Sequence, residues 1–175
     1  KGVESLKASK EIVYDPQMPV KPDLYVIALS VSDYKDSRFN LQYSVKDGKD
    51  IADMFGSIRS STDEYNRIII DTLFNRKAVK ENFFALKEKL MKTKVDDQVI
   101  VFASGHGLLD KNLDFYFASW DIDFRNPETR GISFDDMENL LDSIPARKKL
   151  LMVDACHSGE VDKEIGPELV AMNVE

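Results

Sequence analysis

The sequence predicts a single α/β domain whose mainly parallel sheet carries helices on both faces. Four short segments are almost continuously apolar, as strands that are covered on both faces must be. Segments with the apolar period of amphipathic helices lie between them. This alternation of strand and helix is typical of open, doubly wound α/β proteins. The length of 175 residues and the hydrophobic fraction of 43% are sufficient for one domain with its own core.

The expected elements follow one another along the chain. The four expected strands are residues 24–31, 67–73, 98–104 and 149–155. The three main expected helices are residues 47–58, 75–92 and 133–144, and a hairpin precedes the last of them. The second and third helices have apolar stripes that should enter the core, formed by Val79, Phe83, Leu86 and Leu90 and by Met137, Leu140, Leu141 and Ile144. Asn75 is suited to cap the second helix, and Ser133 with Asp136 forms a capping-box pattern on the third.

The two ends of the chain are expected to lie outside this domain. Residues 1–22 should form an extended N-terminal linker, since residues 14–23 contain three prolines. The domain itself is expected over residues 23–160, followed by a mobile loop over residues 161–175. The chain starts at Lys1 without an initiator Met, so we expect it to be a piece of a longer protein.

Composition excludes several classes of partner. The chain has 24 Lys and Arg against 31 Asp and Glu, and its net charge of -7 argues against a nucleic-acid-binding protein. No apolar run approaches the roughly 20 residues of a membrane-spanning helix, so no membrane contact is expected. The one cysteine, Cys156, cannot form an internal disulfide, which fits a reducing compartment and predicts a cytoplasmic location.

Two reactive side chains follow neighbouring expected strands. His106 comes after the third strand and Cys156 after the fourth, and ligands of open α/β sheets bind at the carboxyl ends of the strands. On the residues alone, Cys156 can be a buried apolar residue, a metal ligand or a nucleophile. A thiol with an ordinary pKa is only about 3% ionised at neutral pH, so a nucleophilic role needs an imidazole such as that of His106.

The other chemistries considered lack their usual sequence patterns. No paired C-x-x-C or H-x-x-x-H spacing is present, which argues against a structural zinc site. Asp162 stands where a cysteine-based phosphatase loop would carry arginine, and no G-x-S-x-G of a serine hydrolase occurs. A flavodoxin-type ligand-binding or phosphoacceptor domain would want an acidic pair after the first strand, and residues 30–37 offer no adjacent pair.

The motifs ASGHG (residues 103–107) and DACHSG (residues 154–159) resemble those of caspase-like cysteine peptidases, in the metacaspase and prokaryotic branch. The separation of 50 residues between His106 and Cys156 (156 minus 106) agrees with the spacing of about 50 in caspases. The resemblance covers roughly residues 23–160, including the stretches 41–55, 115–123 and 131–144. It implies the three-layer caspase-like fold, of which this chain is the large-subunit portion, with the last strands supplied by a segment beyond residue 175.

The resemblance implies a role for individual residues. Cys156 corresponds to the nucleophile and His106 to the general base and acid. The backbone N–H groups of Gly107 and Cys156 correspond to the oxyanion hole. His157 is expected to be a bystander, because a residue adjacent to Cys156 is poorly placed to act as its base.

The same resemblance implies specificity for basic residues. Asp47 and Asp154 match the aspartates that line an acidic pocket for arginine or lysine in metacaspases. Two carboxylates hold a guanidinium through charge-assisted hydrogen bonds and repel acidic side chains. The substrate is therefore expected to be a protein or peptide with Arg or Lys before the scissile bond. The structural alternatives are a helix N-cap for Asp47 and a buried, hydrogen-bonded strand end for Asp154.

The expected enzyme is a regulated, self-processing endopeptidase without a cofactor. Residues 110–142 hold nine carboxylates and three basic residues, a local balance of -6. Some metacaspases bind activating calcium through such a region, but a solvated acidic face is the preferred interpretation here. A small-subunit segment from the same gene is the expected partner. The alternative function is a catalytically silent caspase-like domain that acts by binding.

Overall fold

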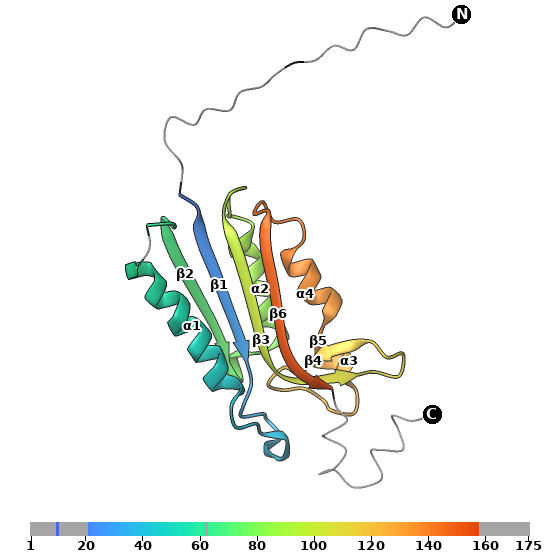
Figure 1. The fold of residues 1–175 in the computed structure, drawn as a ribbon. Helices are drawn as coiled ribbons and strands as arrows, with labels where there is room; N and C mark the ends of the chain where they lie inside the picture. The colour runs from blue at the N-terminus through green and yellow to red at the C-terminus, as the bar shows by residue number, and fades with distance from the viewer. Residues whose placement is uncertain (1–9, 11–20, 62, 158–175) are drawn as a thin grey trace, which may run out of the picture.

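The computed structural model describes residues 10, 21–61 and 63–157 (Figure 1). The predicted mobile loop over residues 161–175 lies outside these residues. The predicted N-terminal linker over residues 1–22 also lies outside them, except for residues 10, 21 and 22.

The sheet has six strands, of which the four long ones are parallel. They are β1 (Asp23–Ser30), β2 (Arg67–Phe74), β3 (Gln98–Leu109), β4 (Phe115–Phe117), β5 (Ile132–Ser133) and β6 (Lys148–His157). Neighbouring strands pair in the order β2-β1-β3-β4-β5, and β6 also pairs with β3. Gly107 pairs with both Phe117 of β4 and His157 of β6, so the short antiparallel hairpin and β6 lie on opposite sides of β3. The predicted mainly parallel α/β sheet is confirmed.

Helices cover both faces of the sheet, as predicted. They are α1 (Ser44–Ser61), α2 (Lys80–Leu90), α3 (Pro127–Arg130) and α4 (Phe134–Leu141), with 3-10 turns η1 (Ser37–Phe39) and η2 (Asn75–Lys77). Successive residues of β1 alternate between two apolar clusters, as the pleat of a strand requires. Ile27 and Leu29 pack in the cluster that includes residues of α2 and α4, whereas Val26 packs in the cluster that α1 covers. These contacts define three layers.

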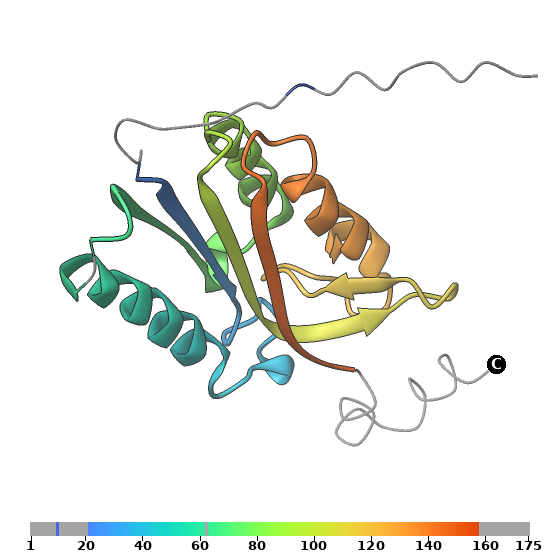
Figure 2. The same ribbon diagram turned by 45° about the horizontal axis from the view of Figure 1, so that its top comes forward.

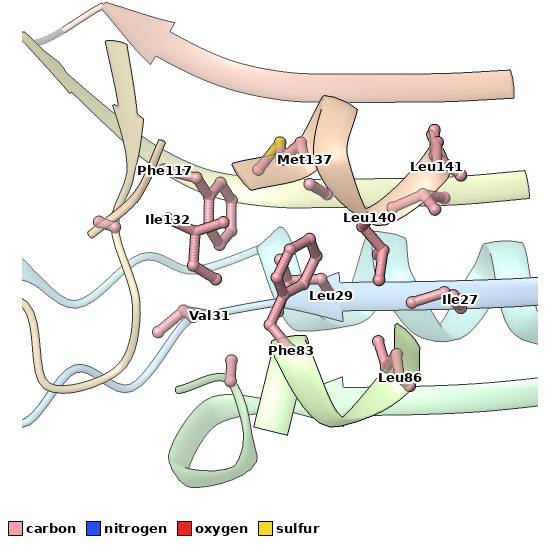
Figure 3. Close-up of a cluster of buried hydrophobic side chains, with 14 of the residues drawn as sticks. Ile27, Leu29, Val31, Phe83, Leu86, Phe117, Ile132, Met137, Leu140 and Leu141 are labelled. Atoms are coloured by element: carbon pink, nitrogen blue, oxygen red, sulfur yellow. The ribbon is translucent and has the colours of Figure 1, made fainter. Parts of the chain in front are cut away.

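The larger cluster forms the main core (Figure 3). Phe83 and Leu86 of α2 meet Met137 and Leu140 of α4 above the β1 residue Leu29. Each of these side chains is at most 9% exposed. The predicted apolar stripes therefore enter the core, except for Val79, which precedes α2 and is only half-buried. Burying side chains of this size stabilises the fold by about 1.5–3 kcal/mol each, before the loss of conformational entropy is counted.

The second helix begins five residues later than predicted, at Lys80, and Asn75 does not cap it. Asn75 adopts a left-handed conformation with φ 49°. Its side-chain Oδ1 accepts hydrogen bonds from the backbone N–H groups of Ser32 and Asp33, at 2.9 and 3.0 Å. The cap prediction was wrong because this amide holds the loop that follows β1, and a residue used in that way cannot also start the helix.

The third helix starts as predicted, with a capping box. The Ser133 hydroxyl accepts a hydrogen bond from the Asp136 N–H, and the Asp136 carboxylate accepts one from the Ser133 N–H, both at 3.0 Å. Among the described residues, no helix is long and apolar enough to cross a membrane.

Candidate active site

His106 and Cys156 occupy paired positions on neighbouring strands. The Cα of His106 on β3 is the partner of the Cα of Cys156 on β6, within a parallel register that runs from Gln98 to Gly107 on β3. Neighbouring strands lie about 4.8 Å apart. Two residues that are 50 positions apart in the sequence, by subtraction of their numbers, are thus brought to the same point near the carboxyl ends of their strands. Figure 2 shows β6 alongside β3 over this stretch.

The loop after β1 fixes the imidazole of His106. Its Nε2 lies 3.0 Å from the backbone carbonyl oxygen of Phe39 in η1. A carbonyl can only accept, so Nε2 carries the hydrogen and Nδ1 of the neutral ring has a free lone pair. The backbone N–H of His106 donates to the hydroxyl of Tyr34 at 2.9 Å. The ring is therefore held in the tautomer that can accept a proton at Nδ1.

Aromatic rings enclose the imidazole. The ring centroid of Tyr34 lies 5.2 Å from that of His106, and the ring of Phe124 approaches edge-on at 5.8 Å. Phe124 in turn stacks on Phe39, with centroids 3.5 Å apart. Burial among these rings lowers the pKa of His106 below its ordinary value of 6.5, while the Phe39 carbonyl acts in the opposite direction. The neutral form that a general base needs is therefore favoured near neutral pH.

The loop that provides the Phe39 carbonyl is tied down by backbone hydrogen bonds. Besides the two bonds to Asn75, the Tyr34 N–H donates to Oδ1 of Asn40 at 2.8 Å. The Leu41 N–H donates to the carbonyl of Ser32 at 2.8 Å. Sequence reasoning missed the role of these residues. The asparagines were a usable signal, since Asn tolerates the left-handed conformation and often bonds to nearby backbone groups in loops.

The structure contradicts the alternative interpretation of Asp154 as a buried strand end. The residue pairs with Ser104 of β3 at the end of the sheet, two positions before the pair of His106 and Cys156. Its side chain is exposed. The interpretation of Asp154 as a buried, hydrogen-bonded strand end is therefore wrong, because β6 has no neighbour on its far side among the described residues.

Asp47 lies in the first turn of α1, which starts at Ser44, three residues before the expected position. The N-cap interpretation is therefore also wrong. Its side chain is half-buried. Among the described residues, no hydrogen bond or ion pair joins the carboxylate of Asp47 to that of Asp154 or to any other side chain. The structure thus places the two carboxylates on separate elements and does not itself bring them into contact.

The first turn of α1 packs very closely on the end of β1. A Cβ added to Gly48 would lie 2.3 Å from the Ser30 hydroxyl oxygen and 2.9 Å from the ring of Phe74. Only glycine permits this approach, which fixes the position of the neighbouring Asp47. The Ser30 side chain is 0% exposed, and its hydroxyl has no hydrogen-bond partner among the described residues.

A pocket of about 600 Å³ opens beside the aromatic rings. It is bounded by the loop after β1 and by the segment after β4, and Phe39 and Phe124 separate it from His106. Its remaining lining residues are Lys35, Asp36, Ser37, Arg38, Asp121, Ile122, Asp123 and Arg125. The pocket is polar, and Asp36 forms an ion pair with Arg38 within it.

No group of three or more His, Cys, Asp or Glu side chains in the described part of the chain is arranged to hold a metal ion. Several carboxylates of the acidic region bind neighbouring groups. Asp110 accepts hydrogen bonds from the N–H groups of Asn112 and Asp114, at 2.8 and 2.9 Å. Asp121 pairs with Arg130. These contacts fit the interpretation of this region as an acidic face without bound calcium, and the expectation that the protein has no cofactor stays a prediction.

Comparison with known proteins identifies related sequences and folds. A family model described as a caspase domain matches residues 25–171. A crystal structure of a protein from Geobacter sulfurreducens has the same fold, with a TM-score of 0.61 and 19% sequence identity. That match covers 80% of this chain and 53% of the other, so the chain spans about half the length of that protein. No curated protein matches.

Proposed function

Since the chain belongs to the caspase domain family, we propose that it is a cysteine endopeptidase with Cys156 as nucleophile and His106 as general base and acid. One observation carries this proposal. The two residues are register partners on β3 and β6, and the hydrogen bond from Nε2 of His106 to the Phe39 carbonyl leaves Nδ1 free to accept a proton. The alternative function, a catalytically silent binding domain, would not require the His106 tautomer with hydrogen on Nε2.

The proposed reaction has two stages. In the first, the Cys156 thiol gives its proton to Nδ1 of His106, and the sulfur attacks the substrate carbonyl carbon. The backbone N–H groups of Gly107 and Cys156 stabilise the resulting oxyanion. His106 then gives the proton to the leaving amine, and a thioester remains on Cys156. In the second stage, His106 takes a proton from water as the water oxygen attacks the thioester carbon. The carbon–sulfur bond then breaks, His106 returns the proton to the sulfur of Cys156, and the carboxylic acid product leaves.

We further propose that Asp47 and Asp154 select Arg or Lys before the scissile bond. Both side chains reach solvent, and neither carboxylate is engaged by another side chain among the described residues. Carboxylates in this state are available to bind a guanidinium or an ammonium group. They would repel an acidic substrate side chain.

A second segment of the same gene product is proposed to complete the sheet next to β6. In the described chain, β6 pairs only with β3, so its other edge has unpaired backbone groups. Leu150 and Val153 of this strand are 48% and 39% exposed. We propose that the protein is a self-processing enzyme that acts in the cytoplasm and needs no metal or cofactor.

The first test is hydrolysis of fluorogenic peptides that end in Arg, Lys, Asp or Leu. The full-length protein is compared with Cys156→Ala and His106→Ala, and with His157→Ala as the matched control. We expect cleavage after Arg and Lys, a loss of about 10³-fold or more in the first two variants, and retention in the third. Addition or chelation of calcium should not change the rates.

Variants of the proposed pocket give a separate test. Asp47→Asn and Asp154→Asn should each raise KM for Arg peptides by about tenfold, since each removes one charge-assisted contact worth about 1.5–3 kcal/mol. Cleavage after Asp by the unmodified enzyme would contradict the roles of both residues. Silence across all peptides, even after proteolytic activation, would favour the binding-domain alternative.

A further inference from the structure

The imidazole of His106 is held by residues from two separate loops. Tyr34 and Phe39 belong to the loop that follows β1, and Phe124 belongs to the segment between β4 and α3. Phe124 contacts both the imidazole and the loop that follows β1. It contacts the imidazole edge-on at 5.8 Å with an angle of 79° between the rings, and it stacks on Phe39 at 3.5 Å with an angle of 14°.

The Phe39 carbonyl is positioned by the hydrogen bonds of its loop and by the packing of the Phe39 side chain. Phe39 ends η1, a 3-10 turn of three residues that Asp36 caps. So short a turn has little stability of its own, because it closes few backbone hydrogen bonds. The Phe39 side chain is nevertheless only 7% exposed, and the stacked ring of Phe124 accounts for part of that burial. Without this ring, the hydrogen bonds of Asn40 and Leu41 would still hold the loop, but the turn would lose the packing of Phe39 that sets its carbonyl against Nε2.

Phe124 is itself well anchored. Ile122, two residues before it, is 8% exposed and packs in the main core. The carboxylate of Asp123 accepts hydrogen bonds from the Arg125 N–H at 2.9 Å and from the Asn126 side-chain amide at 3.0 Å. The backbone on both sides of Phe124 is therefore fixed, and its ring can serve as a rigid support.

We propose that Phe124 is a positioning residue for His106: it presses the Phe39 carbonyl onto Nε2 and keeps water from one face of the imidazole, so that Nδ1 stays the proton acceptor. This inference rests on the proposed function for its kinetic consequences, but the geometry of the imidazole can be measured without any activity. Phe124 does not touch the reacting atoms and acts only through His106 and Phe39.

The ionisable groups near the imidazole come from three elements. On the loop after β1, Tyr34 faces the ring, and burial raises its pKa, so it stays neutral in the range of interest. On β6, Cys156 occupies the paired position. The charged residues of the pocket between the two loops lie beyond Phe39 and Phe124, and they are Lys35, Asp36, Arg38, Asp121, Asp123 and Arg125.

The kinetic test compares three variants of the full-length enzyme. Phe124→Ala should lower kcat by about tenfold or more with KM changed by less than about twofold, because substrate binding is untouched while the base is misplaced. Phe124→Tyr keeps the stacked ring and should restore kcat. Phe115→Ala is the matched control, since Phe115 is also partly buried against the main core but has no ring contact with His106.

The pH profile supplies a readout that a merely structural role would not move. Burial is the larger influence on the pKa of His106, and it lowers that pKa. Phe124→Ala should admit water, which raises the pKa, and release the Phe39 carbonyl, which lowers it. Since burial is the larger influence, the acidic limb of the kcat profile should move to higher pH. Phe124→Tyr and Phe115→Ala should keep the limb of the unmodified enzyme.

The activity-independent test is ¹⁵N nuclear magnetic resonance of the His106 imidazole, assigned by comparison with His106→Gln. The unmodified protein should show the tautomer with hydrogen on Nε2, and Phe124→Ala should show a mixture of tautomers. If Phe124→Ala does not fold, Phe124→Leu removes the stacking while it keeps the apolar volume. Unchanged tautomer and pH profile in the folded variant, or the same changes in Phe115→Ala, would overturn the inference. Absence of Cys156-dependent hydrolysis would instead contradict the proposed function and leave the resonance test decisive.

Discussion

The residue on which the site depends is His106, whose environment opposes the gain of charge. The ring is half-buried, and its surroundings are mainly aromatic. Burial lowers its pKa, and the carbonyl of Phe39 only partly offsets this effect. A histidine with a lowered pKa is uncharged at neutral pH. It is therefore able to accept a proton, which in the proposed reaction comes from the Cys156 thiol.

The same shift predicts how the stability of the protein depends on pH. In the unfolded chain His106 should titrate near its ordinary value of 6.5, and in the folded protein at a lower pH. Between these values the unfolded state binds more protons, so stability falls as the pH falls through this window. Above the window the contribution of His106 is fully present, and below the folded pKa the loss is complete.

Urea unfolding of the unmodified protein and of His106→Gln, at several pH values from about 7.5 to about 5, measures this contribution. We expect the free energy of unfolding of the unmodified protein to decrease relative to that of His106→Gln over this range, because other groups titrate in both proteins. A constant difference between the two proteins across the range would mean that burial does not shift the pKa of His106.

At the scale of the element, the first turn of α1 depends on a glycine. Gly48→Ala should destabilise the protein by about 1–3 kcal/mol, because the new methyl group would overlap the Ser30 hydroxyl and the Phe74 ring. It should also raise KM for Arg peptides, since Asp47 is adjacent. Chemical denaturation and kinetics measure both effects.

Gly56 provides the matched control in the same helix. A Cβ there would meet only the methyl end of Ile70, at 3.6 Å. Gly56→Ala should therefore stabilise the protein by about 0.5–1 kcal/mol through helix propensity alone, without a change in KM. Equal effects at Gly48 and Gly56 would show that close packing against β1 does not matter.

The boundaries of the elements show which features the sequence specifies locally. Ser133 and Asp136 mark the start of α4 correctly, because a capping box is formed by residues within one turn. Asn75 misled the prediction of α2, because its partners Ser32 and Asp33 are more than 40 residues away in the sequence. A propensity for capping cannot reveal a long-range partner that competes for the same side chain.

At the scale of the whole molecule, the mainly parallel sheet and both helical layers follow from the alternation of apolar strands and amphipathic helices, whereas the order of the strands comes from the structure. The family motifs led to His106 and Cys156, whose catalytic roles stay predictions. The enclosing Tyr34, Phe39 and Phe124 could not be predicted, since they are spread over 90 positions of sequence (124 minus 34) and meet only in the folded protein. Hydrophobic period predicts burial but not which aromatic rings will be neighbours.

One edge of β6 has no partner strand among residues 21–61 and 63–157, and this edge leads to a prediction about association. An exposed strand with unpaired backbone groups and apolar side chains is a template for pairing with another strand. We therefore expect the 175-residue chain to associate with itself through β6 at high concentration, and the segment proposed to complete the sheet to suppress this in the longer protein. Sedimentation velocity of both proteins over a range of concentrations measures the effect.

Leu150→Lys tests whether β6 is the surface responsible, and Met54→Lys is its control. Leu150 is 48% exposed on β6, whereas Met54 is 47% exposed on α1, so the two substitutions add the same charge at equally exposed positions. A lysine on the edge strand opposes pairing because two like charges would face each other across the new ladder. Leu150→Lys should weaken association of the 175-residue chain by about tenfold or more, and Met54→Lys should leave it nearly unchanged. Equal weakening in both variants would trace association to net charge and would remove this support for a missing neighbour of β6.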